Sequence, residues 1–149
     1  MIIAYLALGS NLKTPERQLH QAIHALRKIP KTRVQDTASF FHNKAYGRKS
    51  LANYCNTVLK IATSLTPSEL LYQCQQIESQ QGRVRRRKWD ARTLDIDIIF
   101  FAKRIIKTPN LTIPHPRILE RDFVYKPLLK INPEIRWPNG QLLAAMVYT

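Results

Sequence analysis

Residues 93–101, TLDIDIIFF, decide the fold, because apolar residues alternate there with two carboxylates. In a β-strand successive side chains point to opposite faces. One face is therefore predicted to be buried and apolar, with Leu94, Ile96, Ile98 and Phe100. Asp95 and Asp97 share the other face, about 7 Å apart at ~3.3 Å per residue. Asp disfavours strands, and two carboxylates this close repel each other unless a cation lies between them. The stretch predicts either a cation-binding functional site or a solvated edge strand paired with arginines.

The sequence on either side completes an α+β pattern. Strands are predicted in four stretches, 2–8, 33–42, 54–62 and 93–101, from their apolar or alternating side chains. Two helices are predicted, one beginning after a Thr14-Pro15 cap and one at the capping box Thr66–Glu69. The order strand-helix-strand-strand-helix-strand is that of a ferredoxin-like, split βαβ antiparallel sheet. We expect the helices on one face and an extra C-terminal segment with short elements at 121–130 and 141–147.

Two connections are predicted from turn signals and short apolar pairs. Gly9-Ser10-Asn11 is interpreted as a turn that ends the first strand. Ile105-Ile106 is expected to pair back on the preceding strand as a hairpin.

Length and composition indicate one globular domain, residues 1–149, with an anionic partner. The 149 residues contain 24 Lys+Arg and 10 Asp+Glu, a formal charge of +14. Such an excess favours nucleic acid, an acidic membrane surface or a polyphosphate. The sequence has no run of 18 apolar residues and no charged region before its first apolar stretch, so we expect no membrane span or secretion signal. Cys55 and Cys74 are expected to be buried, reduced thiols, which suits the cytoplasm.

A basic run precedes the two carboxylates. It contains Arg83, Arg85, Arg86, Arg87, Lys88 and Arg92, with Trp89 among them. A basic run alone is more often a solvated loop or a nucleic-acid patch. Beside an Asp-x-Asp strand it favours a nucleoside triphosphate, because Mg²⁺ on hard oxygens can bridge phosphates while arginines neutralise the remaining charge.

Two further positions are weak signals by themselves. Tyr54 and Asn56 share a strand face by the period of two, so they form either an ordinary surface pair or a site that stacks on and reads a flat heterocycle. Pro114-His115-Pro116 presents one histidine on a rigid turn close to Arg121 and Phe123. That histidine is either structural or part of the second wall of a cleft.

The chain resembles the 6-hydroxymethyl-7,8-dihydropterin pyrophosphokinase family of folate biosynthesis almost end to end. The motifs that carry the resemblance are AYLALGSNL at the start, Tyr54-x-Asn56, Gln75-Gln76-Ile77-Glu78, Gln81-Gly82-Arg83-Val84-Arg85, Arg92-Thr93-Leu94-Asp95-Ile96-Asp97-Ile98, and Thr112-Ile113-Pro114-His115 with Arg121 and Phe123. The Arg-Thr-Leu-Asp-x-Asp run with its upstream Gly-Arg-Val-Arg is the most specific of them. The chain departs from the family pattern in the loop Asn43–Gly47, at Asp90 and at Pro116.

The resemblance implies a ferredoxin-like fold and transfer of the pyrophosphoryl group of ATP to the pterin hydroxymethyl group, releasing AMP. It implies ATP as co-substrate and two Mg²⁺ held by Asp95 and Asp97, with Arg83 and Arg92 stabilising charge during transfer. The residues implied around ATP are Gln75, Glu78, Arg85, Trp89, Ile98, Thr112, His115 and Arg121. For the pterin they are Tyr54, Asn56 and Phe123. We expect a cytoplasmic monomer that acts on small molecules, with no specific nucleic acid and no membrane partner.

The alternative is a basic RNA-binding module without catalysis, because RNA-recognition domains share the split βαβ order. The chain lacks the K/R-G-F/Y-G/A-F-V run of those domains. Two acids on the sheet would also repel phosphate in the absence of a metal.

Overall fold

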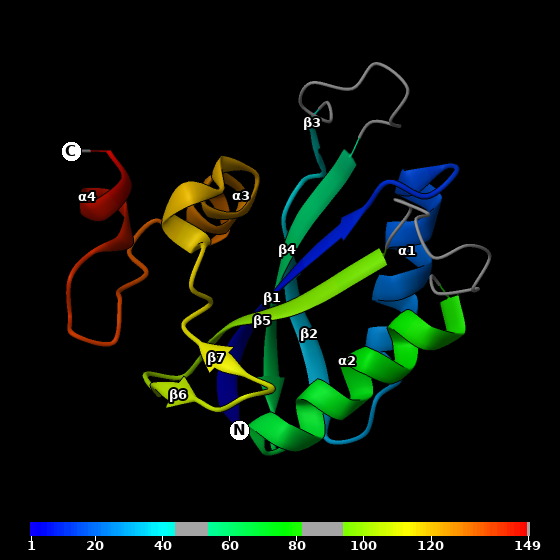
Figure 1. Ribbon diagram of the computed structural model, residues 1–149, viewed down its shortest axis with the longest axis horizontal. Helices are drawn as coiled ribbons and strands as arrows, with labels where there is room; N and C mark the ends of the chain where they lie inside the picture. The colour runs from blue at the N-terminus through cyan, green and yellow to red at the C-terminus, as the bar shows by residue number, and fades with distance from the viewer. Residues whose placement is uncertain (44–53, 82–93, 149) are drawn as a thin grey trace.

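The computed structural model describes residues 1–43, 54–81 and 94–148 (Figure 1). Its strands are β1 (Ile2–Ser10), β2 (Thr32–Thr37), β3 (Phe41–Asn43), β4 (Tyr54–Thr63), β5 (Leu94–Phe101), β6 (Ile106–Lys107) and β7 (Thr112–Ile113). Its helices are α1 (Pro15–Leu26), α2 (Pro67–Gln81), α3 (Asp122–Ile131) and α4 (Leu143–Val147), with a 3₁₀ turn, η1 (Ile118–Glu120).

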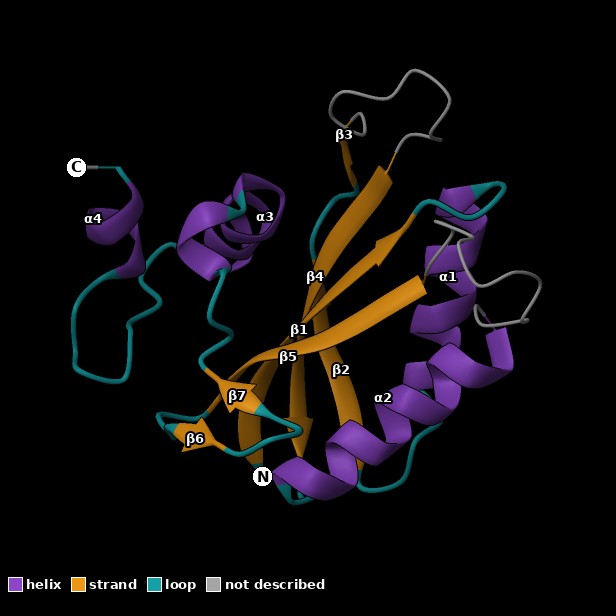
Figure 2. Cartoon of the chain, in the orientation of Figure 1, coloured by secondary structure: helices purple, strands orange, loops and turns teal. Residues whose placement is uncertain are grey.

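The main sheet has the strand order β2-β4-β1-β5, and β3 pairs with the N-terminal end of β4. The pairings of β1 with β4 and β5, and of β4 with β2 and β3, are antiparallel. Helices α1 and α2 lie together on one side of this sheet (Figure 2). The arrangement confirms the predicted ferredoxin-like α+β fold and places β1 at the centre, between β4 and β5.

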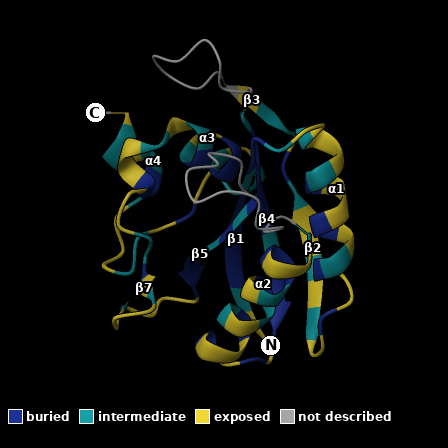
Figure 3. Cartoon of the chain, turned by 45° about the vertical axis from the view of Figure 1, so that its right-hand side comes forward, coloured by how far each residue is buried: buried dark blue, intermediate teal, exposed yellow. Residues whose placement is uncertain are grey.

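Both faces of the sheet are covered over part of their area (Figure 3). The face under α1 and α2 buries Leu6 and Leu8 of β1 with the apolar sides of both helices. The opposite face buries Tyr5, Ala7 and Phe100 beneath η1, α3 and α4. This double burial explains why the first strand is a continuous apolar run and does not alternate.

The helix-forming signals in the sequence are largely confirmed. The capping box closes as predicted: the Thr66 N–H donates to Glu69 Oε1 at 2.8 Å, and the Glu69 N–H donates to Thr66 Oγ1 at 3.2 Å. These bonds lower the pKa of Glu69. Thr14, in contrast, does not cap α1. It adopts a left-handed conformation with φ 52°, makes no side-chain capping bond, and turns its Oγ1 to the Lys13 carbonyl at 2.6 Å.

Three expectations about the strands are wrong in detail. Gly9 and Ser10 continue β1, because they pair with β4 on one side and β5 on the other. The stretch 33–42 is interrupted after β2, where the Ala38 N–H bonds back to the Val58 carbonyl and β3 begins only at Phe41. β6 pairs with β7 through a turn closed by the Thr108 N–H and Leu111 carbonyl, and does not pair back on β5.

Both cysteines are free and buried, as predicted. Burial raises the pKa of Cys55 to about 11 and that of Cys74 to about 12. Across the described part of the chain, no helix combines the length and apolar character that crossing a membrane requires.

Candidate active site

One face of the sheet gathers polar residues that the sequence singled out. Asn56 of β4 lies opposite Gly9 of β1, and Gly9 lies opposite Asp95 of β5. Directly opposed residues share a face, and the period of two adds Tyr54 and Asp97 to it. The predicted face-sharing of Tyr54 with Asn56, and of Asp95 with Asp97, is therefore confirmed. The residues predicted to bind a heterocycle, on β4, and those predicted to bind a metal, on β5, therefore lie on either side of β1.

A β-bulge in β5 changes the predicted alternation. Successive residues of β1 pair with Ile98 and Phe100, which leaves Ile99 as an extra residue. Beyond the bulge the two faces are exchanged. Phe100 therefore packs beneath α3, and Phe101 takes the position against α1 and α2. The prediction that Phe100 shares a face with Ile98 is wrong for this reason.

The same bulge anchors His115. The carbonyl of Ile99 accepts a hydrogen bond from the His115 N–H at 3.1 Å. The Nδ1 atom of His115 accepts the backbone N–H of Arg117 at 3.2 Å. The proton of the neutral ring is therefore on Nε2, which lies 3.9 Å from Oδ2 of Asp97.

Burial and two nearby arginines favour the neutral form of this histidine. Burial lowers the pKa of His115, and the guanidinium groups of Arg121 and Arg117 act in the same direction, while Asp97 opposes them. The side chain of Asp97 is 42% exposed, so its carboxylate can still reach solvent or a ligand. His115 thus presents an N–H donor beside an accessible carboxylate at the edge of β5.

Glu78 supports β5 at its outer edge. The side chain is buried at the C-terminal half of α2, and its Oε2 accepts the Ile96 N–H at 2.7 Å. Among the described strands β5 is the edge of the main sheet, so this bond satisfies a backbone donor that has no strand partner there. Because Ile96 lies between Asp95 and Asp97, Glu78 holds the part of β5 that presents both carboxylates.

A groove of about 270 Å³ runs along the outer edge of β5. It is lined by Leu71, Ile96, Asp97, Ile98, Pro109, Asn110, Leu111, Thr112, His115 and Pro116. The Ile96 N–H points to this edge, and the strand period places the backbone N–H of Ile98 on the same edge. Three of the residues predicted around ATP, Ile98, Thr112 and His115, thus meet in one groove beside Asp97. The β6–β7 segment forms its outer wall. The sequence signals there, the apolar pair Ile105-Ile106 and the motif Thr112–His115, did not predict a groove.

The start of α3 brings two more predicted residues together. The guanidinium carbon of Arg121 lies 5.9 Å from the centre of the Phe123 ring, a cation–π contact. Phe123 is half-buried and packs against the apolar cluster beneath α3. α3 also contacts β3 and β4, so Phe123 belongs to the same face as Tyr54.

Other predicted site residues lie neither in the groove along β5 nor at the start of α3. Gln75 is exposed on α2. Arg83, Arg85, Trp89 and Arg92 lie outside the described residues, as do positions 44–47 of the atypical loop.

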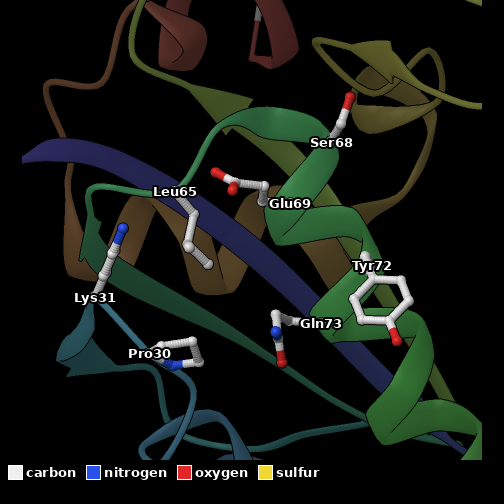
Figure 4. Close-up of a pocket in the computed structure, with 7 residues that line it drawn as sticks. All are labelled: Pro30, Lys31, Leu65, Ser68, Glu69, Tyr72 and Gln73. Atoms are coloured by element: carbon white, nitrogen blue, oxygen red, sulfur yellow. The ribbon is translucent and has the colours of Figure 1, made fainter.

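A second hollow, of about 450 Å³, lies where the α1–β2 connection meets the start of α2 (Figure 4). Its lining residues are Pro30, Lys31, Leu65, Ser68, Glu69, Tyr72 and Gln73. It adjoins the C-terminal end of β4, whereas Tyr54 begins that strand. None of the predicted site residues within the described ranges lines this hollow.

The donor set on β5 fits Mg²⁺. Among the described residues, no group of three or more His, Cys, Asp or Glu side chains could hold a metal by itself. Mg²⁺ is usually bound by one or two carboxylates together with waters and substrate phosphates, and does not need an all-protein cage. Asp95 and Asp97, both partly exposed hard-oxygen donors on one face, match that requirement.

Comparisons with known proteins agree on one family. The family model described as 7,8-dihydro-6-hydroxymethylpterin-pyrophosphokinase matches residues 5–133. The chain is 45% identical over 147 residues to a 2-amino-4-hydroxy-6-hydroxymethyldihydropteridine pyrophosphokinase of Haemophilus influenzae, covering 99% of this chain and 92% of the relative. Its identity to the enzyme of the same name from Pseudomonas aeruginosa is 36%, covering 96% and 88%.

The fold is also similar to that of a solved structure. The Plasmodium falciparum HPPK-DHPS A437G chain superposes with a TM-score of 0.76 at 14% identity, covering 98% of this chain and 45% of that one. This chain thus spans less than half of that longer protein. At such low identity the likeness supports the fold alone.

Proposed function

Because this chain belongs to the 7,8-dihydro-6-hydroxymethylpterin-pyrophosphokinase family, we propose that the polar face of β1, β4 and β5 is its active site. The chain transfers the pyrophosphoryl group of ATP to the hydroxymethyl group of 6-hydroxymethyl-7,8-dihydropterin in folate synthesis, releasing AMP. The reaction depends on Mg²⁺, as is general for the family. The main observation for this site is that Asn56 and Asp95 lie opposite Gly9 on its two sides. The residue proposed to recognise the heterocycle and a residue proposed to bind metal therefore lie on either side of β1. An RNA-binding role is not favoured.

The pterin occupies the β3–β4 side of this face. Tyr54 and Phe123 stack on its two surfaces, and the carboxamide of Asn56 hydrogen-bonds its edge. An amide offers both a donor and an acceptor, which suits the mixed donor and acceptor edge of a pterin. The sheet supports this proposal, because Tyr54 and Asn56 share a face that α3 overhangs.

Asp95 and Asp97 bind two Mg²⁺ together with the phosphates of ATP. When bound, Mg²⁺ neutralises phosphate charge and lowers the pKa of a coordinated hydroxyl. The protein's part is to keep both carboxylates on one rigid strand, next to the pterin side of the face. Glu78 contributes to the ATP site by holding the outer edge of that strand at Ile96.

The nucleoside part of ATP lies in the groove along β5. The backbone N–H of Ile98 faces the outer edge of β5, where a neighbouring strand would otherwise pair. It can form a hydrogen bond with a planar base instead. Thr112 and the neutral His115 line the same groove, and His115 Nε2–H faces the phosphates near Asp97. Arg121 approaches from the start of α3, and Gln75 from the exposed side of α2.

The reaction needs positioning and charge stabilisation more than covalent catalysis. The pterin hydroxyl attacks the β-phosphorus in line, and the bond to the α-phosphate oxygen breaks to release AMP. Arg83 and Arg92 offset the charge that develops during transfer, and Arg85 and Trp89 add contacts to ATP. These four assignments rest on the family's motif at positions outside the described residues.

We also propose that residues 1–149 act as one domain, as a monomer, in the cytoplasm. Two free, buried cysteines support a reducing compartment.

The identity of the adenine nucleotide product tests the proposed reaction. Incubation with ATP, Mg²⁺ and the reduced hydroxymethylpterin should yield pterin-dependent AMP in a ratio of one to one with the diphosphorylated pterin. Chromatographic detection of ADP in place of AMP would mean attack at the γ-phosphorus and would contradict the proposal. RNA binding without nucleotide turnover would favour the alternative.

A further inference from the structure

Gly9 lies in the middle of the functional face, in a position where glycine is unfavourable for the sheet. It is near the end of the central strand β1 and pairs on both sides. Glycine inside a strand loses backbone entropy and packs no side chain. It is retained where the backbone needs a left-handed φ, where a bulge forms, or where another group approaches closely.

The first two reasons do not apply to Gly9. Among the described residues, Gly140 is the glycine with positive φ. The bulge in the β1–β5 pairing falls between Tyr5 and Leu6, several residues before Gly9. A close approach remains as the physical reason.

The approaching group is the carboxamide of Asn56. A Cβ built on Gly9 would lie 2.6 Å from Asn56 Oδ1 and 3.7 Å from its Cγ. Apart from Gly9 itself and its two chain neighbours, no other heavy atom of the described residues lies within 4 Å of that Cβ. Asp95, although it pairs with Gly9 from the other side, is therefore clear of it. A methyl group on Gly9 would displace the Asn56 amide and leave the Asp95 carboxylate in place.

We propose that Gly9 is a positioning residue for pterin recognition, because its missing side chain lets the Asn56 carboxamide lie across β1. This inference rests on the proposed function of Asn56 as the residue that reads the pterin edge. Gly9 touches neither reacting atom, and it acts through the orientation of one amide.

The test is a double-mutant cycle with Gly9→Ala, Asn56→Ala and the double variant. Pterin affinity is measured by calorimetry with a saturating non-hydrolysable ATP analogue and Mg²⁺, and ATP affinity is measured without pterin. Gly9→Ala should weaken pterin binding by about 10- to 100-fold, the range expected when a buried polar partner is lost. ATP affinity should change by less than about 2-fold. The double variant should bind pterin no more weakly than Asn56→Ala alone, because the displaced group is then absent.

Gly140→Ala is the matched control. It makes the same chemical change at φ 93°, where no heavy atom of the described residues beyond the chain neighbours lies within 4 Å of the new Cβ. It should lower thermal stability through backbone strain and leave pterin affinity unchanged.

The outcomes separate this inference from the proposed function. If Asn56→Ala leaves pterin affinity unchanged, the assignment of Asn56 itself is wrong. If Asn56→Ala weakens binding but Gly9→Ala does not, or if the two effects add fully, Gly9 does not act through Asn56 and the inference is overturned. An equal loss of ATP affinity in Gly9→Ala would also overturn it.

Discussion

Replacing Glu78 by alanine is expected to lower both stability and turnover, because its carboxylate supports the strand that carries both aspartates. The bond from the Ile96 N–H to Glu78 Oε2 is 2.7 Å long, and both residues are buried. Leaving that N–H without an acceptor should cost about 1–3 kcal/mol. For a chain of this size, this corresponds to a fall in Tm of roughly 3–10 °C.

Glu78→Gln distinguishes support of the strand from direct contact with ATP. Its amide oxygen can still accept the Ile96 N–H, so we expect it to recover most of the stability lost in Glu78→Ala. Ser79→Ala, at the exposed neighbouring position, is the control for a change on the same helix. Thermal unfolding is followed by circular dichroism, and kcat, KM for ATP and the Mg²⁺ dependence are measured for each variant.

We expect Glu78→Ala to lose kcat and to need more Mg²⁺, because Asp95 and Asp97 move with β5. An unchanged Tm together with a raised KM for ATP would refute it and assign Glu78 to the nucleotide itself. The same conclusion would follow if Glu78→Gln were as defective in ATP binding as Glu78→Ala, with normal stability.

Three further perturbations test the rest of the site. Asp97→Ala, and equally Asp95→Ala, should lose several kcal/mol of transition-state stabilisation with little change in Tm, because both side chains are partly exposed; near-normal turnover in both would exclude the metal role. Tyr54→Ala and Phe123→Ala should each weaken pterin binding by roughly 1–3 kcal/mol, by analogy with base–aromatic stacking, while ATP affinity measured alone stays constant; equal losses for both ligands would mean that these rings are structural. Arg83→Ala should lower turnover at low and high salt, whereas Arg87→Ala should show only a small loss of ATP affinity that fades with salt; identical behaviour of the two would show that the basic run acts as diffuse charge.

The elements that carry the site could be predicted because their signals are local. The capping box at Thr66 and Glu69 is a pair of side-chain to backbone bonds within one turn, and it fixes the start of α2. The alternation of Asp95 and Asp97 with apolar residues likewise depends only on the strand period. Both signals are confirmed, and together with the strand and helix order they determine the ferredoxin-like fold.

The predictions that failed concern features that depend on tertiary contacts and that no local sequence pattern reveals. Residues 98–101 are all apolar, so the sequence offers no sign that Ile99 is a bulge and that Phe100 changes face. Gly9-Ser10-Asn11 has the composition of a turn, yet pairing with strands on both sides keeps Gly9 in the sheet. The groove along β5 depends on β6 and β7 pairing with each other, which is a tertiary property. Glu78 as a support for β5 is likewise visible only once α2 is packed.

A crystal structure with Mg²⁺, a non-hydrolysable ATP analogue and the reduced hydroxymethylpterin would test the proposed active site most directly. It should show the pterin between Tyr54 and Phe123 with Asn56 on its edge, metal on Asp95 and Asp97, and the base in the groove beside Ile98 and Thr112. Nucleotide bound instead in the hollow near Lys31 and Tyr72, with both aspartates free of metal, would contradict it.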